Sequence, residues 1–409
     1  MKRERWKITY KFVFMIMLSV LLISRIQVLT DNYTWPLDPV LLEMVYLAGT
    51  AVLCLLAQGG KYRILRGKYL LVMTILLIHT VLWGTVFVDD RFTDLINSQF
   101  KSQIMFVTIL WVNVLAVYQL DAGRDFLRCC YYTLSVMLIY YFLTNLSELD
   151  LSNLANIMTV SDRSRANFGF GHYNALGGTC VCCILMRETV KKEHHSIATK
   201  TVDAVILVVA VCMLLACASR SALTSLVVYY FVYYSWQMDE WAISPKAIRA
   251  IKVGRNLLIV AMVLWVVLEA NYTELLNLSQ RSLLFTHALP MFFDTGKIWL
   301  GLGYASNMAY ATQQTPYLTY WLDNAYIYYL ITTGIVGCAL LMIALLILGR
   351  ELYKRVGQPF GKEVFAAFAV YLYASLFEAT LFHSGGFVNY IYLPWFLIYI
   401  SRKRKTETS

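Results

Sequence analysis

Charged side chains are scarce in this chain of 409 residues: 15% are Asp, Glu, Lys or Arg, whereas 59% are hydrophobic. A soluble globular domain carries roughly 25% charged residues. A chain this apolar cannot cover its folded surface with polar groups, which excludes an ordinary soluble domain. The composition therefore predicts a protein whose main solvent is lipid.

Proline is also rare, with seven in the chain, and only Pro394 is clearly inside a hydrophobic run. The paired interrupted helices that many transporters place around a mid-membrane site are not evident. The nine cysteines lie almost entirely within hydrophobic runs, so no disulfide framework is expected. No two histidines have the spacing of a zinc site, and we expect neither a metal site nor a cofactor.

Long hydrophobic runs are the dominant feature of the sequence. The first run ends near Val28 without a small-residue cleavage site, so it is interpreted as a retained helix. A membrane span needs about 20 apolar residues. The sequence predicts an all-α, polytopic membrane protein of about twelve transmembrane helices, with residues 1–409 forming a single integral membrane domain. The further runs lie near residues 38–57, 69–88, 103–120, 129–145, 172–187, 203–218, 221–236, 255–270, 324–349, 363–382 and 386–400.

The basic residues predict the orientation of these helices. With the N-terminus in the cytoplasm, 27 of the 35 lysines and arginines fall in cytoplasmic segments. Basic residues are retained on the cytoplasmic side of membranes, so both termini are predicted to be cytoplasmic. The net charge of +10 is divided among short clusters rather than along one continuous stripe, which argues against a nucleic-acid partner.

Two segments, residues 146–171 and 271–323, are predicted to be extracytoplasmic loops. Within the larger loop, three residue pairs recur at helical spacing and predict an amphipathic helix on the membrane surface. These pairs are Leu283-Leu284, His287-Ala288 and Met291-Phe292. Long ordered loops in compact proteins are usually functional.

Arginines on the outward side are the strongest candidates for a site. Arg220 lies between two hydrophobic runs, where a charge is costly unless it is partnered or faces water. Snorkelling to lipid headgroups is the simpler alternative for this residue. Arg281, Arg163 and Arg165 are further outward cations. Guanidinium groups match phosphate oxygens, so several on one face predict a lipid diphosphate ligand.

Other polar residues in the apolar runs are interpreted more simply. Glu43 and Glu378 are expected to face the interior of the helix bundle. Asp89 and Asp90 end the third run and are interpreted as solvated helix-end charges rather than metal ligands. A lone outward histidine such as His172 is more often a structural hydrogen-bonding residue than a base.

Several segments, in their order, resemble the O-antigen polymerase and O-antigen ligase superfamily, including Wzy-type capsular and exopolysaccharide polymerases. The resemblance covers roughly residues 130–350, and the large outward loop before the last three helices agrees with it. The matching pieces are Phe168-Gly-Phe-Gly-His-Tyr-Asn-Ala-Leu-Gly177, Ala218-Ser-Arg-Ser-Ala-Leu223, Arg281, Gly301-Leu-Gly303, Asp323-Asn-Ala-Tyr326 and Gly334-Ile-Val-Gly337.

The resemblance implies transfer of a glycan from undecaprenyl diphosphate to a sugar hydroxyl at the outer face of the bacterial cytoplasmic membrane. Arg220 and Arg281 match the family's diphosphate-binding arginines, which would stabilise the leaving group without a metal ion. Asp323 is the first candidate for the base that accepts the hydroxyl proton, and His287 is the second. Ligases commonly have a histidine where this chain has Asp323, which favours a polymerase.

The remaining candidates would bind the glycan, because aromatic faces stack on sugar rings and amides bond to hydroxyls. They are His172, Asn174, Asn324, Tyr326, Tyr320 and Trp321. Anchoring at the membrane interface is the alternative for each aromatic residue. The resemblance also implies a lipid-linked oligosaccharide, membrane lipid, a chain-length regulator and a flippase as partners. Two alternative functions stay open: a ligase that transfers finished polymer to another acceptor, and a flippase for lipid-linked sugars.

Overall fold

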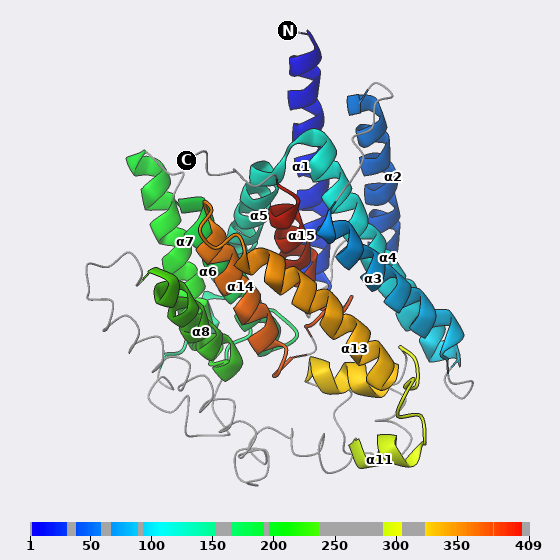
Figure 1. The fold of residues 1–409 in the computed structure, drawn as a ribbon. Coiled ribbons are helices and arrows are strands. Elements are labelled where there is room, and N and C mark those ends of the chain that lie inside the picture. The colour runs from blue at the N-terminus through cyan, green and yellow to red at the C-terminus, as the bar shows by residue number, and fades with distance from the viewer. Residues whose placement is uncertain are drawn as a thin grey trace, which may run out of the picture.

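The computed structural model describes residues 2–30, 38–58, 67–88, 93–151, 165–191, 196–237, 289–304, 324–378 and 380–402. These residues form helices and turns without a β-strand, which confirms the all-α prediction for this part of the chain. The longer helices in the first half are α1 (Lys2–Gln27), α2 (Pro39–Gln58), α3 (Lys68–Val81), α4 (Thr93–Leu120), α5 (Gly123–Thr144) and α6 (Tyr173–Val190). They are followed by α7 (Ile197–Ala216), α8 (Arg220–Gln237), the short α11 (Leu289–Asp294), α13 (Ala325–Tyr353), α14 (Gly361–Ala374) and α15 (Asn389–Ser401) (Figure 1).

Seven helices in the described residues are long and apolar enough to cross a membrane. They are α1, α2, α3 with its π-helical continuation Leu82–Val86, α4, α5, α7 and α13. The runs that correspond to α6, α8, α14 and α15 are helical but do not reach the same combination of length and hydropathy. The run at 255–270 lies outside the described residues, so the total of about twelve spans stays a prediction.

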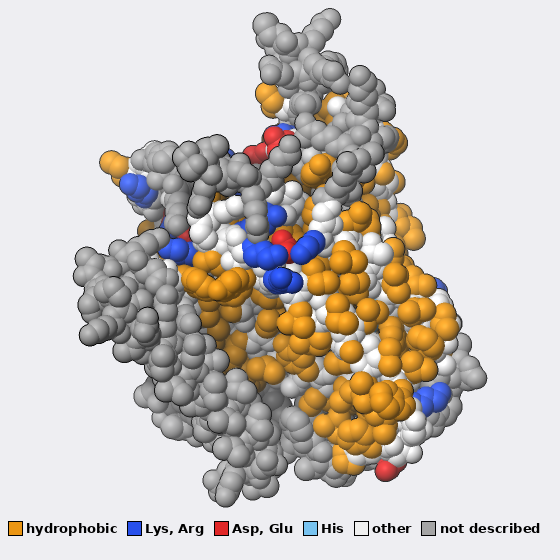
Figure 2. All heavy atoms as spheres, in the orientation of Figure 1, with side chains coloured by type: hydrophobic (Ala, Val, Ile, Leu, Met, Phe, Trp, Pro, Cys, Tyr) orange, Lys and Arg blue, Asp and Glu red, His pale blue; other side chains and the backbone are white. Residues whose placement is uncertain are grey.

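The surface of the bundle is strongly apolar. Large hydrophobic side chains on different helices are well exposed, including Phe12, Val136, Val227 and Leu346, which are 65–68% accessible. Figure 2 shows a broad hydrophobic face below a group of basic and acidic side chains. Soluble monomers rarely expose continuous apolar surface on this scale, and a lipid environment accounts for it.

Basic residues gather at one end of the bundle, which we call the basic end. There the Lys11 ammonium donates a hydrogen bond to the Asp121 carbonyl at 2.9 Å, in the turn between α4 and α5. The Arg402 guanidinium, just beyond α15, lies against Gly123 at the start of α5. The first half of α1 and the end of α15 therefore meet the same turn, as the positions of the two helices in Figure 1 also show. This arrangement agrees with the predicted common side for both termini, whose cytoplasmic location stays a prediction.

Helix α13 is broken at Gly334, which has φ 65° and ψ −171°. The segment around Gly301 fills the break: the Leu302 amide donates to the Ile331 carbonyl at 3.1 Å and the Gly303 amide to the Thr332 carbonyl at 2.8 Å. A Cβ atom at Gly301 would lie 2.5 Å from the Gly334 nitrogen. Only glycine tolerates this positive φ and close approach together. Two pieces of sequence that the family resemblance singled out are thus packing partners.

The predicted loop at 271–323 is described only over residues 289–304. Helix α11 contains the Met291-Phe292 pair of the predicted surface helix, but it has only six residues. The Phe292 side chain is fully buried, whereas Phe293 is half exposed. A longer surface helix stays a prediction, because its first two residue pairs lie outside the described residues.

Candidate functional site

The segment before α6 is held in place by the preceding helices. The Glu148 carboxylate accepts hydrogen bonds from the backbone amides of Asn167 and Phe168, at 3.1 and 2.7 Å. The Asn145 side-chain amide donates to the Phe168 carbonyl at 3.2 Å. Because a charged acceptor with two backbone donors is a strong arrangement, residues 167–168 have a fixed position at the start of the site.

Two predicted site residues flank the beginning of α6. The Arg165 guanidinium lies over the ring of Tyr173, 4.1 Å from its centroid. His172 is the N-cap of α6, and its Nδ1 accepts a hydrogen bond from the Asn174 amide at 3.2 Å. Such contacts fix the helix start. His172 therefore makes a structural hydrogen bond, and its role in glycan binding stays a prediction.

Asn174 connects this segment to the start of α8. Its side-chain oxygen accepts a hydrogen bond from the Ser219 hydroxyl at 3.0 Å, and Ser219 is also 3.2 Å from the Ser221 hydroxyl. Arg220 lies between these two serines, begins α8 and is partly buried. The structure therefore brings together the two family-like pieces that carry Asn174 and Arg220, although 45 residues separate Asn174 from Ser219.

Helices α6 and α8 approach closely at Gly177. A Cβ atom at this position would lie 2.9 Å from the Ala222 Cβ and 3.0 Å from the Ser219 Cβ. At Gly178, one residue later, no atom would lie within 4 Å of an added Cβ. The first glycine permits the helix contact, and the second borders open space.

That open space is a cavity of about 610 Å³. One wall comes from the starts of α6 and α8, and the other from the end of α14 and the segment that leads to α15. The polar lining includes His172, Asn174, Thr179, Ser221, Ser225, Glu378, Thr380 and His383. Apolar and aromatic side chains such as Val370, Tyr371 and Phe387 complete it. A cavity of this size with a few convergent polar groups is suited to a small-molecule ligand.

Glu378 and His383 provide titratable groups on the second wall. His383 lies between α14 and α15 and is 7% exposed, and burial lowers its pKa to about 4. Its imidazole is consequently neutral at pH 7 and is a weak proton acceptor. Its Nδ1 already accepts a hydrogen bond from the Gly385 amide at 3.1 Å. The sequence predicts that Glu378 faces the interior of the helix bundle, and in the structure Glu378 lines this cavity.

Asn324 and Tyr326 are engaged in helix contacts. The Asn324 side-chain oxygen caps α13 by accepting from the amides of Tyr326 and Ile327, and its nitrogen donates to the Leu376 carbonyl at 2.9 Å. The Tyr326 hydroxyl donates to the Leu372 carbonyl at 3.0 Å. Neither residue lines the cavity. Both tie α13 to the end of α14, which forms the second cavity wall.

The other predicted site residues lie outside the described residues. They are the arginines Arg163 and Arg281, the candidate bases His287 and Asp323, and the aromatic residues Tyr320 and Trp321. Asp89 and Asp90 also lie outside. In the part of the chain that the structure describes, no group of three or more His, Cys, Asp or Glu side chains could hold a metal ion.

Glu43 confirms the expectation that it faces the bundle interior. Its carboxylate is 2% exposed and forms an ion pair with Arg25 of α1. The Tyr390 hydroxyl of α15 donates to the same carboxylate at 3.3 Å. Arg25 therefore takes part in the packing of α1 against α2, and it does not line the cavity.

Sequence reasoning did not select Ser221, Ser225, Thr380 or His383 as ligand-binding residues. Serine and threonine in apolar helices are common packing residues, so only their position on the cavity wall distinguishes them. The chain matches no known family model and no curated protein. The geometry of the cavity is consequently the main basis for a functional proposal.

Proposed function

We propose that this protein is a membrane glycosyltransferase that polymerises undecaprenyl-diphosphate-linked oligosaccharide units into a surface polysaccharide. The observation that carries the proposal is the convergence of Asn174, Ser221 and Glu378 on one cavity of about 610 Å³. Arg220 lies next in the chain to Ser221, at the start of α8. A hydroxyl-rich wall and a carboxylate suit the binding of the sugar that is transferred, and Arg220 does not itself line the cavity.

The cavity has the chemistry that an acceptor sugar requires. Hydroxyls, an amide and a carboxylate on the cavity wall can form hydrogen bonds with sugar hydroxyls. Its volume is within the usual range of ligand pockets, about 300–1,000 Å³, and would hold part of an oligosaccharide. The remaining glycan would extend outward while the lipid stays between helices.

The reaction would break the bond between the anomeric carbon and the diphosphate oxygen of the donor. The acceptor hydroxyl oxygen would form the new bond to that carbon and lose its proton to a base. Arg220 and Arg281 would stabilise the charge on the departing diphosphate. Asp323 and His287 are candidate bases from the sequence, and the cavity adds Glu378 as a third.

The decisive experiment supplies the purified full-length protein in lipid nanodiscs with a lipid-diphosphate-linked repeat unit. A ladder of lengthening products identifies a polymerase. A single transfer of finished polymer to a different acceptor identifies a ligase. Movement of the substrate across a proteoliposome membrane without a new glycosidic bond identifies a flippase and rejects the proposal. Activity is expected to survive a chelator, and its reversible loss would restore the metal interpretation of Asp89 and Asp90.

A further inference from the structure

The chemistry of His383 in the large cavity follows from the ring nitrogen that the protein already uses. His383 lines the second wall and is 7% exposed, and its Nδ1 accepts a hydrogen bond from the Gly385 amide at 3.1 Å. A protonated imidazole donates from both nitrogens and cannot accept this bond. The ring is therefore neutral, in agreement with the pKa that burial lowers to about 4, and its proton is on Nε2.

The backbone before His383 has a conformation that residues other than glycine rarely adopt. Phe382 has φ 46°, in the left-handed region. Its carbonyl accepts hydrogen bonds from the Tyr329 hydroxyl at 2.6 Å and from the Gln103 side-chain amide at 2.8 Å. Its amide donates to the Tyr371 hydroxyl at 2.7 Å. Such a conformation persists only where the surrounding structure determines it, so these three side chains fix the place of His383 on the cavity wall.

The Nε2–H group is what His383 can offer to a ligand. Among the described residues, only the Gly385 amide forms a hydrogen bond with this imidazole. The ring of Tyr328 meets it edge to face, with centroids 5.0 Å apart. Buried N–H groups are nearly always hydrogen-bonded. Because His383 lines the cavity, a ligand oxygen that enters the cavity can accept the Nε2 proton.

The other wall of the cavity has hydrogen-bonding groups that are equally fixed. The Asn174 side-chain oxygen accepts the Ser219 hydroxyl proton at 3.0 Å, so its nitrogen is the group left to donate to a ligand. The Ser225 hydroxyl donates to the Ser221 carbonyl at 2.7 Å, so its oxygen is left to accept. Sugar hydroxyls both donate and accept. A sugar can therefore satisfy N–H donors and a hydroxyl acceptor in one cavity.

We propose that His383 binds the sugar of the substrate as a hydrogen-bond donor through Nε2 and selects a sugar with an oxygen at that position. The inference rests on the proposed function for the nature of the ligand, a lipid-linked sugar. It gives His383 a binding role and not a proton-accepting one, because Nδ1 is occupied and Nε2 already carries a proton. A site built to bond to a substrate oxygen discriminates against an analogue that lacks it, since the buried donor is then left unpaired.

Two substitutions separate the roles of the two ring nitrogens. In His383→Asn, the side-chain oxygen takes the place of Nδ1 and can still accept from Gly385, but nothing replaces the Nε2 donor. In His383→Gln, the longer side chain places an amide N–H near the position of Nε2 and leaves Gly385 without its acceptor. A purely structural role predicts that Asn preserves sugar binding and Gln impairs it. The donor role predicts the reverse.

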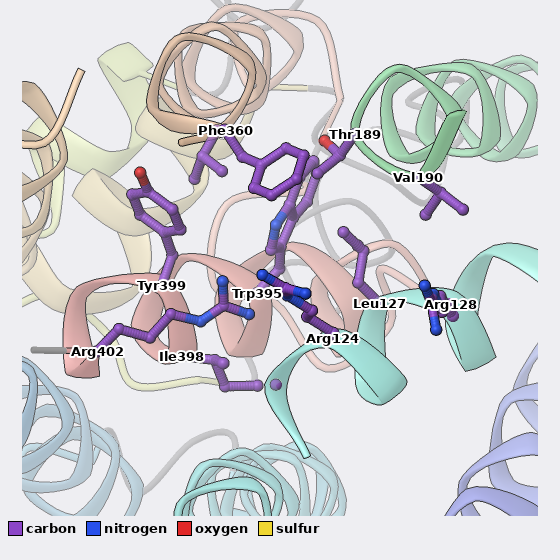
Figure 3. A pocket seen from close by; sticks show the side chains of 12 residues that line it. Arg124, Leu127, Arg128, Thr189, Val190, Phe360, Trp395, Ile398, Tyr399 and Arg402 are labelled. Carbon is purple, nitrogen blue, oxygen red and sulfur yellow. The ribbon is translucent and has the colours of Figure 1, made fainter. Parts of the chain in front are cut away.

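Tyr399→Phe is the control for a general loss of stability. The Tyr399 hydroxyl of α15 donates to the Pro359 carbonyl at 3.0 Å. Figure 3 shows Tyr399 at the basic end, beside a separate cavity of about 30 Å³. Tyr399 does not line the large cavity. This variant should unfold at a lower temperature than the wild type and bind sugar unchanged.

The test measures binding to the full-length protein in lipid nanodiscs. The probes are undecaprenyl diphosphate without a sugar and the same lipid carrying glucose, galactose, N-acetylglucosamine or N-acetylgalactosamine. The ratio of each affinity to that of the bare lipid isolates the contribution of the sugar. For the sugar with the largest ratio, His383→Asn should lower this ratio about three- to tenfold, the loss of one neutral hydrogen bond. His383→Gln should keep most of the ratio but unfold at a lower temperature.

Three results would overturn the inference: an unchanged ratio in His383→Asn, equal weakening of the bare lipid and the sugar-linked probes, or no wild-type preference for any sugar-linked probe over the bare lipid. If His383→Asn does not fold, loss of the ratio in folded His383→Gln overturns it as well. Failure of the proposed function is distinguishable. Sugar binding that needs the Nε2 donor, without a product ladder, keeps the inference and rejects the polymerase. A ladder from His383→Asn with unchanged kcat/KM keeps the polymerase and rejects the inference.

Discussion

The side-chain oxygen of Asn174 lies 3.0 Å from the hydroxyl of Ser219, and this hydrogen bond joins the start of α6 to the turn before α8. Asn174 faces the cavity, whereas Ser219 is 1% exposed. The bond therefore connects a potential ligand-binding amide to the buried residue that precedes Arg220. The two helix starts are thus joined by a direct hydrogen bond.

A double-mutant cycle can measure this connection. Asn174→Ala and Ser219→Ala should each lower the free energy of unfolding of the purified protein. The decrease in the double variant should be about 0.5–1.5 kcal/mol smaller than the sum of the two single decreases. Thermal and denaturant unfolding provide the free energies. Thr224→Ala is a suitable control, because its hydroxyl donates within α8 to the Arg220 carbonyl at 2.8 Å. Strict additivity of Asn174→Ala and Ser219→Ala would contradict the coupling.

Arg220→Ala and Arg281→Ala should each leave a folded, inserted protein that no longer extends the polysaccharide. Removal of a group that stabilises a leaving anion typically lowers the reaction rate about 10²–10³-fold. Product length on gels and turnover of the purified enzyme measure the effect. Lys297→Ala removes an exposed cation in the 289–304 segment and should retain activity. Normal polymer length in the Arg220 variant would reject its role at the donor.

The proton acceptor can be identified by comparing Asp323→Asn with Glu378→Gln. Substitution of the true general base should lower kcat about 10²–10⁴-fold with little change in donor binding. The variant that instead raises KM at constant kcat affects binding alone. Comparable activity of both variants with the wild type would leave His287, the remaining candidate base, as the group to test next.

The adjacent glycines of α6 offer a matched pair of alanine substitutions. Alanine stabilises a helix interior by about 0.5–1 kcal/mol relative to glycine. At Gly178 an added methyl group meets open space, so Gly178→Ala should be neutral or stabilising. At Gly177 it would contact Ala222 and Ser219, and overpacking of this kind costs about 1–3 kcal/mol. Thermal unfolding should rank Gly177→Ala below Gly178→Ala, and the opposite order would disprove the close helix contact.

Hydrophobic runs in the sequence located most of the described helices, because burial of apolar side chains in lipid depends on composition more than on partner contacts. The run at 363–382 is an exception, since α14 ends at Ala374 and turns follow it. Charge distribution likewise grouped residues that the structure places at one end, such as Lys11 and Arg402. The sequence showed the glycine-containing segments only as parts of a family-like pattern and not as packing partners. Their pairing, as between Gly301 and Gly334, was not predictable, because a sequence pattern does not specify which backbone segments approach one another.

Composition and hydrophobic periodicity by themselves determined an all-α protein with membrane-length helices, since each run must satisfy its backbone hydrogen bonds internally. Only the tertiary structure decided which polar residues share a space. Asn174, Ser221 and Glu378 come from three distant segments and meet because α6, α8 and the end of α14 pack together. Local chemistry is readable along the chain, but a binding site is a property of how its helices pack.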